Sequence, residues 1–384
     1  MIAQLFLIAF WFASAAPPPP KTVDITAPDG AVLKATYYAA DRPGPGVILL
    51  HMCNTTRASW EPLGTQLGAA GIHALALDYR GYGESGGERL ETLSPQQRQR
   101  IVAESWPGDI DAALAYLGAQ PGVDKVRIGA AGGSCGVNQA VRLAERHPDV
   151  KSLVLLAGGT DAVGLGFLQQ TPSLPIFAAA AADDQFDADA PRSMQWLLDL
   201  SGNPRNRFAG FADGRHGTEI FGPHPELPRQ IVSWYIETLV TAPADRSASV
   251  QPKGTLVREF WTTLDRDGAE RAVQTFRAAR QRDPDAFLFP EGVMNQAGYE
   301  RLQAGKTKDA IALFTVNVEA YPASANAQDS LGDAYLADGQ TDRALAAARR
   351  CLELLPNDKA NDQFKAAVRA SAEEKIKKLS PGGR

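Results

Sequence analysis

The chain has 384 residues, a formal net charge of −5, and 44% hydrophobic and 22% charged residues. This length allows two or three folding units, and the slightly acidic balance excludes the basic face that a nucleic-acid-binding protein needs, so no nucleic-acid partner is expected. The three cysteines, Cys53, Cys135 and Cys351, are too few for a disulfide scaffold and form no Cys/His cluster of the kind that binds zinc.

An apolar run near the N-terminus predicts an export signal. Residues 5–12 read LFLIAFWF, which is short for a membrane span, and Ala13-Ser14-Ala15 follows as a small-residue cleavage site. We therefore expect a signal peptide at 1–15 and a periplasmic or secreted protein, with a short membrane anchor as the alternative. No later segment reaches the ~18 consecutive apolar residues of a membrane span, so none is expected in the mature chain.

Residues 16–240 alternate between buried strands and helices. Two strands, at 22–28 and 32–38, are joined by the hairpin signal Asp29-Gly30. Apolar runs of strand length follow at 46–50, 73–77, 126–131, 153–156, 174–180 and 207–211. Helical patterns separate most of them, for example at 60–70, 109–117 and 137–146, and a last helix is expected at 228–239. This alternation predicts the α/β class, with a doubly wound and mostly parallel sheet.

The C-terminal third of the chain has an internal period of 34 residues. Gly298 matches Gly332, Gly305 matches Gly339, and the same offset relates Ala310 to Ala344 and Pro322 to Pro356. This is the spacing of tetratricopeptide repeats, which we place at about 253–286, 291–324 and 325–358, with a closing helix at 361–379. A generic pair of helical hairpins is the alternative. Stacked helix pairs form a concave surface, so 253–384 is expected to bind a protein partner or to self-associate.

A linker is expected between these two regions. Residues 241–252 are rich in Pro, Ala, Ser and charged residues, a composition that indicates an extended connection. The predicted organisation is therefore a signal peptide at 1–15, an α/β domain at 16–240, a linker at 241–252 and an all-α repeat domain at 253–384.

The sharpest chemical motif is Gly132-Gly133-Ser134-Cys135-Gly136, which lies between an expected strand and an expected helix. A strand, G-x-S-x-G and a helix are the context of the nucleophile elbow, where glycines allow the sharp turn that exposes the serine. The alternative is a glycine-rich structural turn. A serine nucleophile needs a base, and His216 lies in a small-residue loop after the strand at 207–211, where α/β active sites collect.

The other histidines are weaker candidates for the base. His51 is expected to brace its loop, His73 and His147 are expected to be ordinary partly exposed residues, and His224 lies in a Pro-rich stretch. The orienting acid should lie between the serine and the base in chain order. Asp184 is preferred, and Asp183 is the alternative.

Two backbone N–H groups are expected to form the oxyanion hole. One belongs to Cys135, the residue after the nucleophile, and the other to Cys53 in the loop after the strand at 46–50, with Met52 as the alternative donor. Both donors must lie ~3 Å from one oxygen. Their Cα atoms should then be close to the ~4.4–6.8 Å range of a disulfide, so we hypothesise that Cys53 and Cys135 are bridged. Two separate packed thiols are the alternative, and Cys351 is expected to stay a buried thiol.

Residues 24–240 resemble α/β-hydrolases of the dienelactone hydrolase group. The segments that carry the resemblance are GVILLHMCN, LALDYRGYGESGG, GDIDAALAYL, GAAGGSCG and GRHGTEIF. Dienelactone hydrolases use a cysteine nucleophile, whereas this chain has Ser134, and Met52 replaces the usual glycine after the loop histidine. These departures favour ester or amide hydrolysis over a dienelactone substrate.

The resemblance implies a serine hydrolase that cleaves small-molecule carboxylic esters through an acyl-enzyme on Ser134, with His216 as base and Asp184 as the orienting acid. Such chemistry needs no metal or organic cofactor. The segment at 158–173 is too short for a large cap domain, so an open site is expected. A serine peptidase of the aminopeptidase type and a non-catalytic scaffold are the alternatives.

Overall fold

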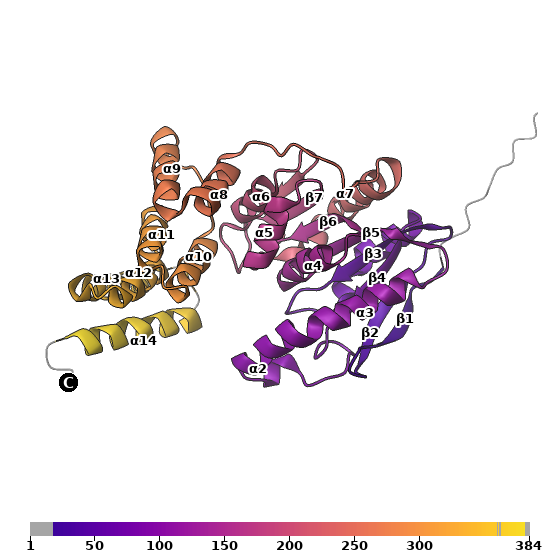
Figure 1. The fold of residues 1–384 in the computed structure, drawn as a ribbon. Helices are drawn as coiled ribbons and strands as arrows, with labels where there is room; N and C mark the ends of the chain where they lie inside the picture. Colours follow the sequence, from indigo (N-terminus) through magenta and orange to yellow (C-terminus); the bar gives the residue numbers. More distant parts are fainter. Residues whose placement is uncertain (1–17, 359, 361, 381–384) are drawn as a thin grey trace, which may run out of the picture. The chain divides into compact units, whose positions relative to one another are not determined.

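The computed structural model describes residues 18–358, 360 and 362–380, so the signal peptide expected at 1–15 lies outside the described residues (Figure 1). The described chain divides into two compact units. The first holds the residues up to Gly164 together with Ser173–Met194 and Arg205–Val250, and the second holds Leu165–Pro172, Gln195–Pro204 and the chain from Gln251 onwards.

The first unit is built on a mostly parallel sheet of eight strands among the described residues, in the order β1-β2-β4-β3-β5-β6-β7-β8. The strands are β1 (Lys21–Thr26), β2 (Val32–Tyr38), β3 (Gly44–Leu50), β4 (His73–Leu77), β5 (Val123–Gly133), β6 (Val150–Leu156), β7 (Ile176–Ala181) and β8 (Arg207–Phe211). β1 and β2 form the antiparallel hairpin predicted from the sequence, with Gly30 at φ +90° in its turn, and β2 also pairs antiparallel with β4. All other neighbours in the sheet are parallel. The predicted α/β class is confirmed.

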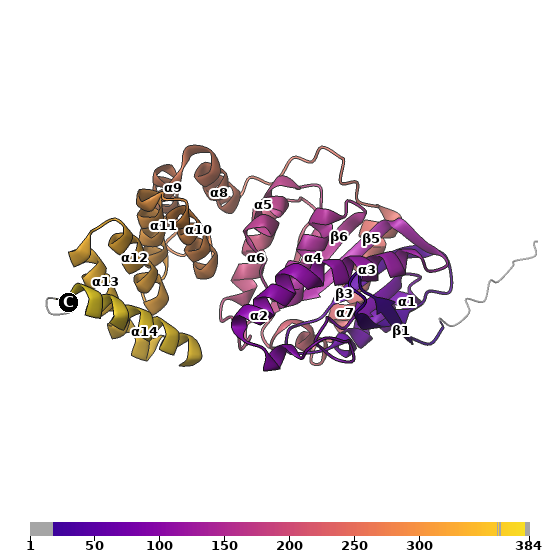
Figure 2. The same ribbon diagram turned by 60° about the horizontal axis from the view of Figure 1, so that its bottom comes forward.

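Helices cover both faces of this sheet (Figures 1 and 2). They are α1 (Glu61–Ala69), α3 (Trp106–Gly118), α4 (Cys135–Arg146) and α7 (Glu226–Tyr235). The short helix α2 (Pro95–Arg100) has no buried residue, and α5 (Ala162–Gln170) and α6 (Ala190–Ser201) begin in the first unit and end in the second. α1 and α7 share one hydrophobic core with alternate residues of the central strands, such as Val47 and Leu49 of β3. Trp60, which precedes α1, and Trp234 of α7 belong to the same core. Because successive strand residues point to opposite faces, Ile48 is buried on the other face.

The parallel strands place the candidate residues at one edge of the sheet. Ser134 follows β5 directly, the loop from His51 follows β3, and Asp184 and His216 lie shortly after β7 and β8. Ligands of open α/β sheets bind at the carboxyl ends of the strands. The strand order therefore collects these four segments at the edge where a site is expected.

The second unit is all-α. Its helices are α8 (Leu256–Asp267), α9 (Ala269–Arg282), α10 (Glu291–Gln303), α11 (Thr307–Ala320), α12 (Ala325–Ala337), α13 (Thr341–Leu354) and α14 (Asp362–Leu379), together with the C-terminal parts of α5 and α6. Gly305 and Gly339 both have φ +72° in the turns between paired helices. Gly298 lets the next helix approach closely, because a Cβ there would lie 2.4 Å from the Phe314 ring, which would have to move. The 34-residue period therefore corresponds to real helix pairs, and α14 lies where the closing helix was expected. Among the described residues, no helix combines the length and the apolar character needed to cross a bilayer.

The division between the units differs from the boundaries predicted at 240 and 253. Arg258 of α8 donates hydrogen bonds to the carbonyl oxygens of Gln169, Leu200 and Ser201, at 3.1, 2.6 and 3.1 Å. These carbonyls end α5 and α6, where a helix has no internal donors left for them. This explains why the ends of both helices belong to the second unit, which no local sequence pattern indicated.

The segment expected as a linker is also more firmly held than its composition suggested. Arg246 donates to the carbonyl oxygens of Ala144, His147 and Val150, at 2.6, 3.0 and 3.2 Å. Ala244 is buried. The residues up to Val250 are therefore part of the first unit, because Arg246 caps the C-terminal end of α4.

Trp196 is expected to be a major stabilising residue of the second unit. Its indole is buried, donates a 2.7 Å hydrogen bond to the carbonyl of Leu288, and packs against Trp261 with ring centroids 5.9 Å apart. Replacing a buried tryptophan with alanine typically costs ~3–5 kcal/mol, so Trp196→Ala should lower the free energy of unfolding by about that amount in urea titrations. Leu256→Ala, at an exposed position of α8, is the control and should change it by less than ~0.5 kcal/mol. Equal effects of the two substitutions would contradict the role of Trp196.

By the same reasoning, a chain that ends at Val250 is expected to be less stable than the full chain. It would keep Trp196 but lose Trp261 and Leu288, which cover its indole. An extended linker at 241–252 would instead imply an α/β domain that folds independently of the helices after it.

Candidate active site

Ser134 occupies a strained turn between β5 and α4. Its φ of 52° and ψ of −120° lie outside the conformations that non-glycine residues ordinarily adopt. The turn is held by a 2.9 Å hydrogen bond from the Ser134 N–H to the carbonyl of Leu156 at the end of β6. Ser134 is only half-buried. Strain of this kind collects at functional sites.

Two flanking glycines make this turn possible. A Cβ on Gly132 would lie 2.0 Å from the Gly136 carbonyl oxygen, and a Cβ on Gly136 would lie 2.3 Å from the Leu50 carbonyl oxygen. Both partners are backbone atoms that cannot move aside. The spacing of glycines around Ser134 is therefore required by the close approach of backbone segments, as the motif predicted.

His216 lies on a loop that is shaped by unusual backbone angles and by acidic side chains. Gly214, Arg215 and Gly217 all have positive φ, at 134°, 61° and 55°. Asp183 accepts a 2.8 Å hydrogen bond from the Arg215 N–H, and Glu219 accepts one of 3.2 Å from the His216 N–H. These contacts fix the loop on both sides of the histidine.

The structure pairs His216 with Asp184. His216 Nδ1 lies 2.6 Å from Asp184 Oδ2, and both residues are buried, at 6% and 7% exposure. The other carboxylate oxygen of Asp184 accepts the N–H groups of Phe186 and Asp187, at 2.8 and 3.1 Å. Burial opposes the charge of Asp184, but the hydrogen bonds from His216 and from Phe186 outweigh it and lower the pKa of Asp184. The alternative acid, Asp183, holds the Arg215 backbone instead.

The serine turn and the histidine loop meet at the end of β6. The Leu156 carbonyl that accepts the Ser134 N–H would lie 3.6 Å from a Cβ on Gly217, next to His216. A Cβ on Gly133, next to Ser134, would lie 3.7 Å from the Thr218 methyl group. The turn that carries Ser134 and the loop that carries His216 are thus neighbours in the fold.

Met52 fills the space beneath this site. It is fully buried, and a Cβ on Gly133 or Gly217 would lie 3.1 or 2.4 Å from its side chain. The large side chain in place of a glycine is therefore accommodated by glycines on the two facing loops.

The two expected oxyanion donors are brought together. Cys53 and Cys135 form a disulfide with a Cα–Cα distance of 5.9 Å, so the hypothesised bridge is present in the structure. Within the part of the chain that the structure describes, no hydrogen bond engages the N–H of either cysteine. Cys351 is a buried free thiol, as expected, and burial raises its pKa to about 12.

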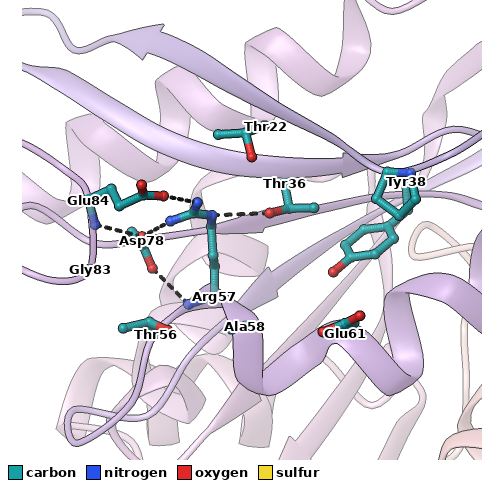
Figure 3. Close-up of a pocket in the computed structure, with 11 residues that line it drawn as sticks. Thr22, Thr36, Tyr38, Thr56, Arg57, Ala58, Glu61, Asp78, Gly83 and Glu84 are labelled. Atoms are coloured by element: carbon teal, nitrogen blue, oxygen red, sulfur yellow. Dashed lines mark hydrogen bonds and ion pairs between the residues drawn. The ribbon is translucent and has the colours of Figure 1, made fainter.

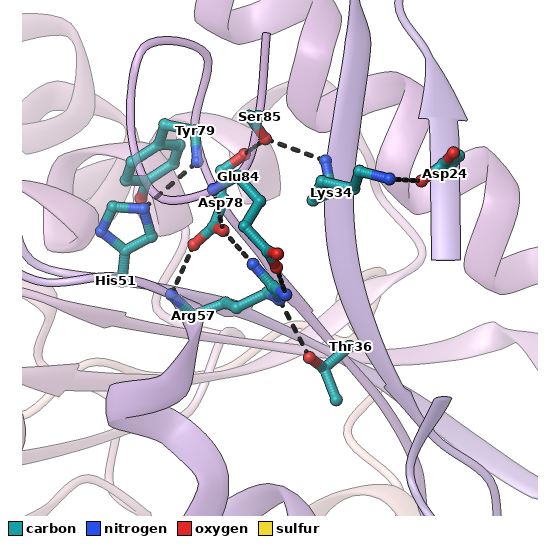
Figure 4. Close-up of polar contacts among 9 residues, drawn as sticks. All are labelled: Asp24, Lys34, Thr36, His51, Arg57, Asp78, Tyr79, Glu84 and Ser85. Atoms are coloured by element: carbon teal, nitrogen blue, oxygen red, sulfur yellow. Dashed lines mark hydrogen bonds and ion pairs between the residues drawn. The ribbon is translucent and has the colours of Figure 1, made fainter. Parts of the chain in front are cut away.

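His51 braces the loop that carries Cys53. Its Nδ1 lies 2.7 Å from the Met52 carbonyl and therefore donates to it, while its Nε2 accepts the Tyr79 N–H at 3.2 Å (Figure 4). Both ring nitrogens are used, and burial lowers the pKa of His51 to about 4 despite its hydrogen bond to Met52. His51 is thus a neutral structural residue. His73, expected to be partly exposed, is buried as well and bonds the Tyr37 hydroxyl at 2.7 Å.

Arg57 anchors the far end of the same loop. Its N–H donates to Asp78 Oδ1 at 2.7 Å, and its guanidinium bonds Asp78, Glu84 and Thr36 (Figures 3 and 4). Asp78 is fully buried and also accepts the Glu84 N–H at 3.0 Å. A cavity of about 400 Å³ borders this cluster, with Tyr38 and Glu61 among its other lining residues (Figure 3). The cluster fixes the loop to the end of β4 and leaves none of the three guanidinium nitrogens of Arg57 free for a ligand.

The low pKa of His51 predicts a pH-dependent stability. Below pH ~6.5 His51 is protonated in the unfolded chain, whereas in the folded chain it stays neutral down to about pH 4. The free energy of unfolding should therefore fall as the pH is lowered from ~6.5 to about 4. The difference corresponds to roughly 3 kcal/mol, at ~1.4 kcal/mol per unit. Urea unfolding at pH 7.5 and pH 5 should therefore show a smaller pH effect in His51→Asn than in the wild type. An identical pH effect in both proteins would contradict the assignment.

Three contributors to the site were not predicted from the sequence. Phe186 is 65% exposed, and its ring lies edge-on to His216 with centroids 4.8 Å apart. Glu219 and Arg57 position the two loops. Phe186 follows the acidic pair closely and Glu219 is three residues after His216, so proximity in sequence was a usable signal for both. Arg57 has no such signal, because Asp78 is 21 residues away.

The strand order and the strained turn at Ser134 between β5 and α4 are those of the α/β-hydrolase fold. A family model described as "Serine aminopeptidase, S33" matches residues 41–182. The sequence motifs resembled dienelactone hydrolases instead, and that finer assignment stays a prediction.

Several known proteins are similar to parts of the chain. "Uncharacterized protein Rv2307c" of Mycobacterium tuberculosis is 32% identical over 167 residues, which are 43% of this chain and 54% of that protein. "Thiohydrolase apmlB" of Arthrinium phaeospermum is 29% identical over 135 residues, which are 35% and 41% of the two chains. The chain thus spans about half the length of the curated relatives it matches.

Solved structures are similar at lower identity. The Pyrococcus furiosus esterase Pf2001 covers 58% of this chain and 91% of its own, with 18% identity and a TM-score of 0.43. The α/β hydrolase GrgF from Penicillium sp. sh18 covers 58% and 99%, with 15% identity and a TM-score of 0.46.

Proposed function

We propose that the protein is a serine hydrolase that cleaves carboxylic esters through an acyl-enzyme on Ser134. The observation that carries the proposal is the buried 2.6 Å contact between His216 and Asp184, on loops that meet the strained turn of Ser134. A charged Asp184 keeps the proton of His216 on Nδ1, which leaves Nε2 able to act as the base.

In the proposed reaction His216 removes the Ser134 hydroxyl proton as the oxygen attacks the substrate carbonyl carbon. The N–H groups of Cys53 and Cys135 stabilise the resulting oxyanion, and the leaving alcohol takes the proton from His216. Water then attacks the acyl-enzyme by the same route in reverse, which releases the acid and restores Ser134. Each oxyanion donor is typically worth ~10²–10³ in rate.

A thioester is a second candidate substrate, because two of the relatives are named thiohydrolases. An amide or peptide substrate is favoured only by the aminopeptidase family model. A peptide amino terminus would need a free carboxylate near the site. Asp183 and Glu219, the acids flanking the His216 loop, already bond Arg215 and the His216 N–H. This favours esters and thioesters over peptides.

A fluorophosphonate probe and a substrate panel test the proposal. The wild type should be labelled at Ser134 and should turn over p-nitrophenyl esters or acyl thioesters faster than aminoacyl p-nitroanilides. Preference for the anilides would establish the peptidase alternative. If the wild type is neither labelled nor active on any of these substrates, the non-catalytic scaffold is the remaining alternative and the proposal is overturned.

We further propose that the protein is exported to the periplasm or secreted, and that its C-terminal helix pairs are tetratricopeptide repeats that bind a protein partner or self-associate. The support for export is the apolar run with its small-residue cleavage site. The support for repeats is the 34-residue spacing of glycine, alanine and proline.

A further inference from the structure

We infer that the Cys53–Cys135 disulfide is a positioning element of the active site, which holds the two oxyanion donors in register, and that its reduction lowers turnover without unfolding the protein. This inference rests on the proposed function. The two cysteines are 82 residues apart in sequence, and each supplies one of the backbone N–H groups assigned to the oxyanion hole.

One of the two donors is held firmly without the bridge. Cys135 is the first residue of α4, a twelve-residue helix whose next residue, Gly136, packs directly against the Leu50 carbonyl. β3 and β5 are neighbours in the sheet, with Leu50 paired to Gly132. The position of the Cys135 N–H is therefore set by the sheet and by α4.

The other donor lies on an exposed loop tip. Cys53 and Asn54 are exposed, and the loop is fixed to the rest of the fold at its two ends, by His51 on Tyr79 and by Arg57 on Asp78 (Figure 4). Between these anchors Thr55 donates to the Met52 carbonyl through its N–H, at 3.1 Å, and its hydroxyl, at 3.3 Å, and the buried Met52 side chain lies near Gly133. The disulfide is the contact that joins Cys53 itself to the residue after Ser134.

Breaking the bridge should therefore release the tip and leave the fold intact. The sheet, α4 and both loop anchors do not depend on the sulfur atoms. An oxyanion donor acts only when it lies ~3 Å from the developing charge, and a misplacement of about 1 Å can cost ~10²-fold in rate. Because substrate binding in the ground state does not need the oxyanion contact, the loss should fall on kcat and not on KM.

The reductant is a dithiol. Its two sulfur atoms form a cyclic disulfide and give up two electrons and two protons, and Cys53 and Cys135 become two thiols. An exported protein would meet oxidising conditions that keep the bridge closed.

The experiment compares the oxidised enzyme, the enzyme reduced with dithiothreitol, and the Cys53→Ala/Cys135→Ala variant. Circular dichroism follows the fold, and thiol counting by mass spectrometry on denatured protein follows the bridge. We expect one free thiol before reduction and three after it, an unchanged circular dichroism spectrum, and a fall in kcat of ~10- to 100-fold with KM unchanged within about twofold. The inhibition constant of a trifluoromethyl ketone, whose adduct with Ser134 carries an oxyanion, should rise by the same factor as kcat falls.

Two controls separate positioning from general effects of the reductant. Cys351→Ser, at the buried thiol of α13, should keep full activity and the full response to dithiothreitol. The double variant should be as slow as the reduced enzyme and insensitive to the reductant. Removal of dithiothreitol under air should restore the activity of the wild type.

The outcomes that overturn the inference are distinct from those that overturn the proposed function. The positioning role would be contradicted by any one of three results. These are three free thiols before reduction, a kcat and an inhibition constant that stay within twofold after reduction, and loss of the folded circular dichroism spectrum on reduction. In all of these cases the untreated wild type still hydrolyses esters and is labelled by a fluorophosphonate. Absence of both activities in the oxidised wild type would instead refute the proposed function.

Discussion

Replacing Ser134 with alanine is expected to lower ester turnover by roughly 10⁴-fold or more, to the residual rate that binding and the oxyanion donors alone supply. The hydroxyl is the proposed nucleophile, and no other residue described at the site can replace it in the acyl-enzyme. The fold should be unaffected, because alanine fits the space of serine and the 2.9 Å contact from the residue 134 N–H to the Leu156 carbonyl remains.

The measurement is kcat/KM for a p-nitrophenyl ester, together with fluorophosphonate labelling. Ser247→Ala, at an exposed serine of the first unit, is the matched control and should retain wild-type turnover and labelling. Turnover of Ser134→Ala within tenfold of the wild type would show that a different group attacks the carbonyl, and the site would have to be sought elsewhere in the chain.

The sequence was most informative where function needs a fixed backbone shape. Gly132 and Gly136 could be identified because a side chain at either position collides with backbone, and such a constraint restricts the residue type locally. The parallel order of strands then placed Ser134, Asp184 and His216 at one edge without further information. The pattern of apolar runs was sufficient for the sheet because buried parallel strands read as continuous apolar segments.

The supporting contacts were beyond the reach of sequence patterns. Arg57 and Asp78 lie on different elements and meet only in the folded chain, so neither position shows a local signal. The same holds for Arg258, whose partners at the ends of α5 and α6 are 57 to 89 residues away. Charged residues read as solvated surface in a linear pattern, whereas here they cap helix ends and anchor a loop.

Met52 shows how a departure from a family pattern can be compensated. Read alone, a large residue in place of a glycine beside the oxyanion loop cast doubt on the substrate. In the structure its side chain is buried against Gly133 and Gly217, and the absence of side chains at these two glycines leaves the space that it occupies. Gly217→Ala should therefore displace either Met52 or the His216 loop, since a Cβ there would lie 2.4 Å from the Met52 sulfur.

The neighbouring acids Asp183 and Asp184 give the sharpest test of the assigned geometry. Asp184→Asn is expected to lower kcat by ~10⁴, the loss typical of an amide replacement of a buried triad acid. The amide is uncharged, so it cannot stabilise the imidazolium, and it can hold His216 in the wrong tautomer. Asp183→Asn should reduce kcat by less than tenfold, because an amide oxygen can still accept the Arg215 N–H.

The pH dependence separates the two roles further. Hydrogen bonds from His216 and Phe186 prevail over burial and lower the pKa of Asp184, so its carboxylate stays charged throughout the range in which histidines titrate. The stability that this charge contributes is present above the unfolded pKa of ~3.9 and is lost as the pH falls through the lower folded value. Asp184→Asn removes this contribution and Asp183→Asn leaves it, so acid unfolding should differ between the variants as well as turnover. A larger loss of kcat in Asp183→Asn than in Asp184→Asn would mean that Asp183 orients His216, contrary to the 2.6 Å contact between Asp184 and His216.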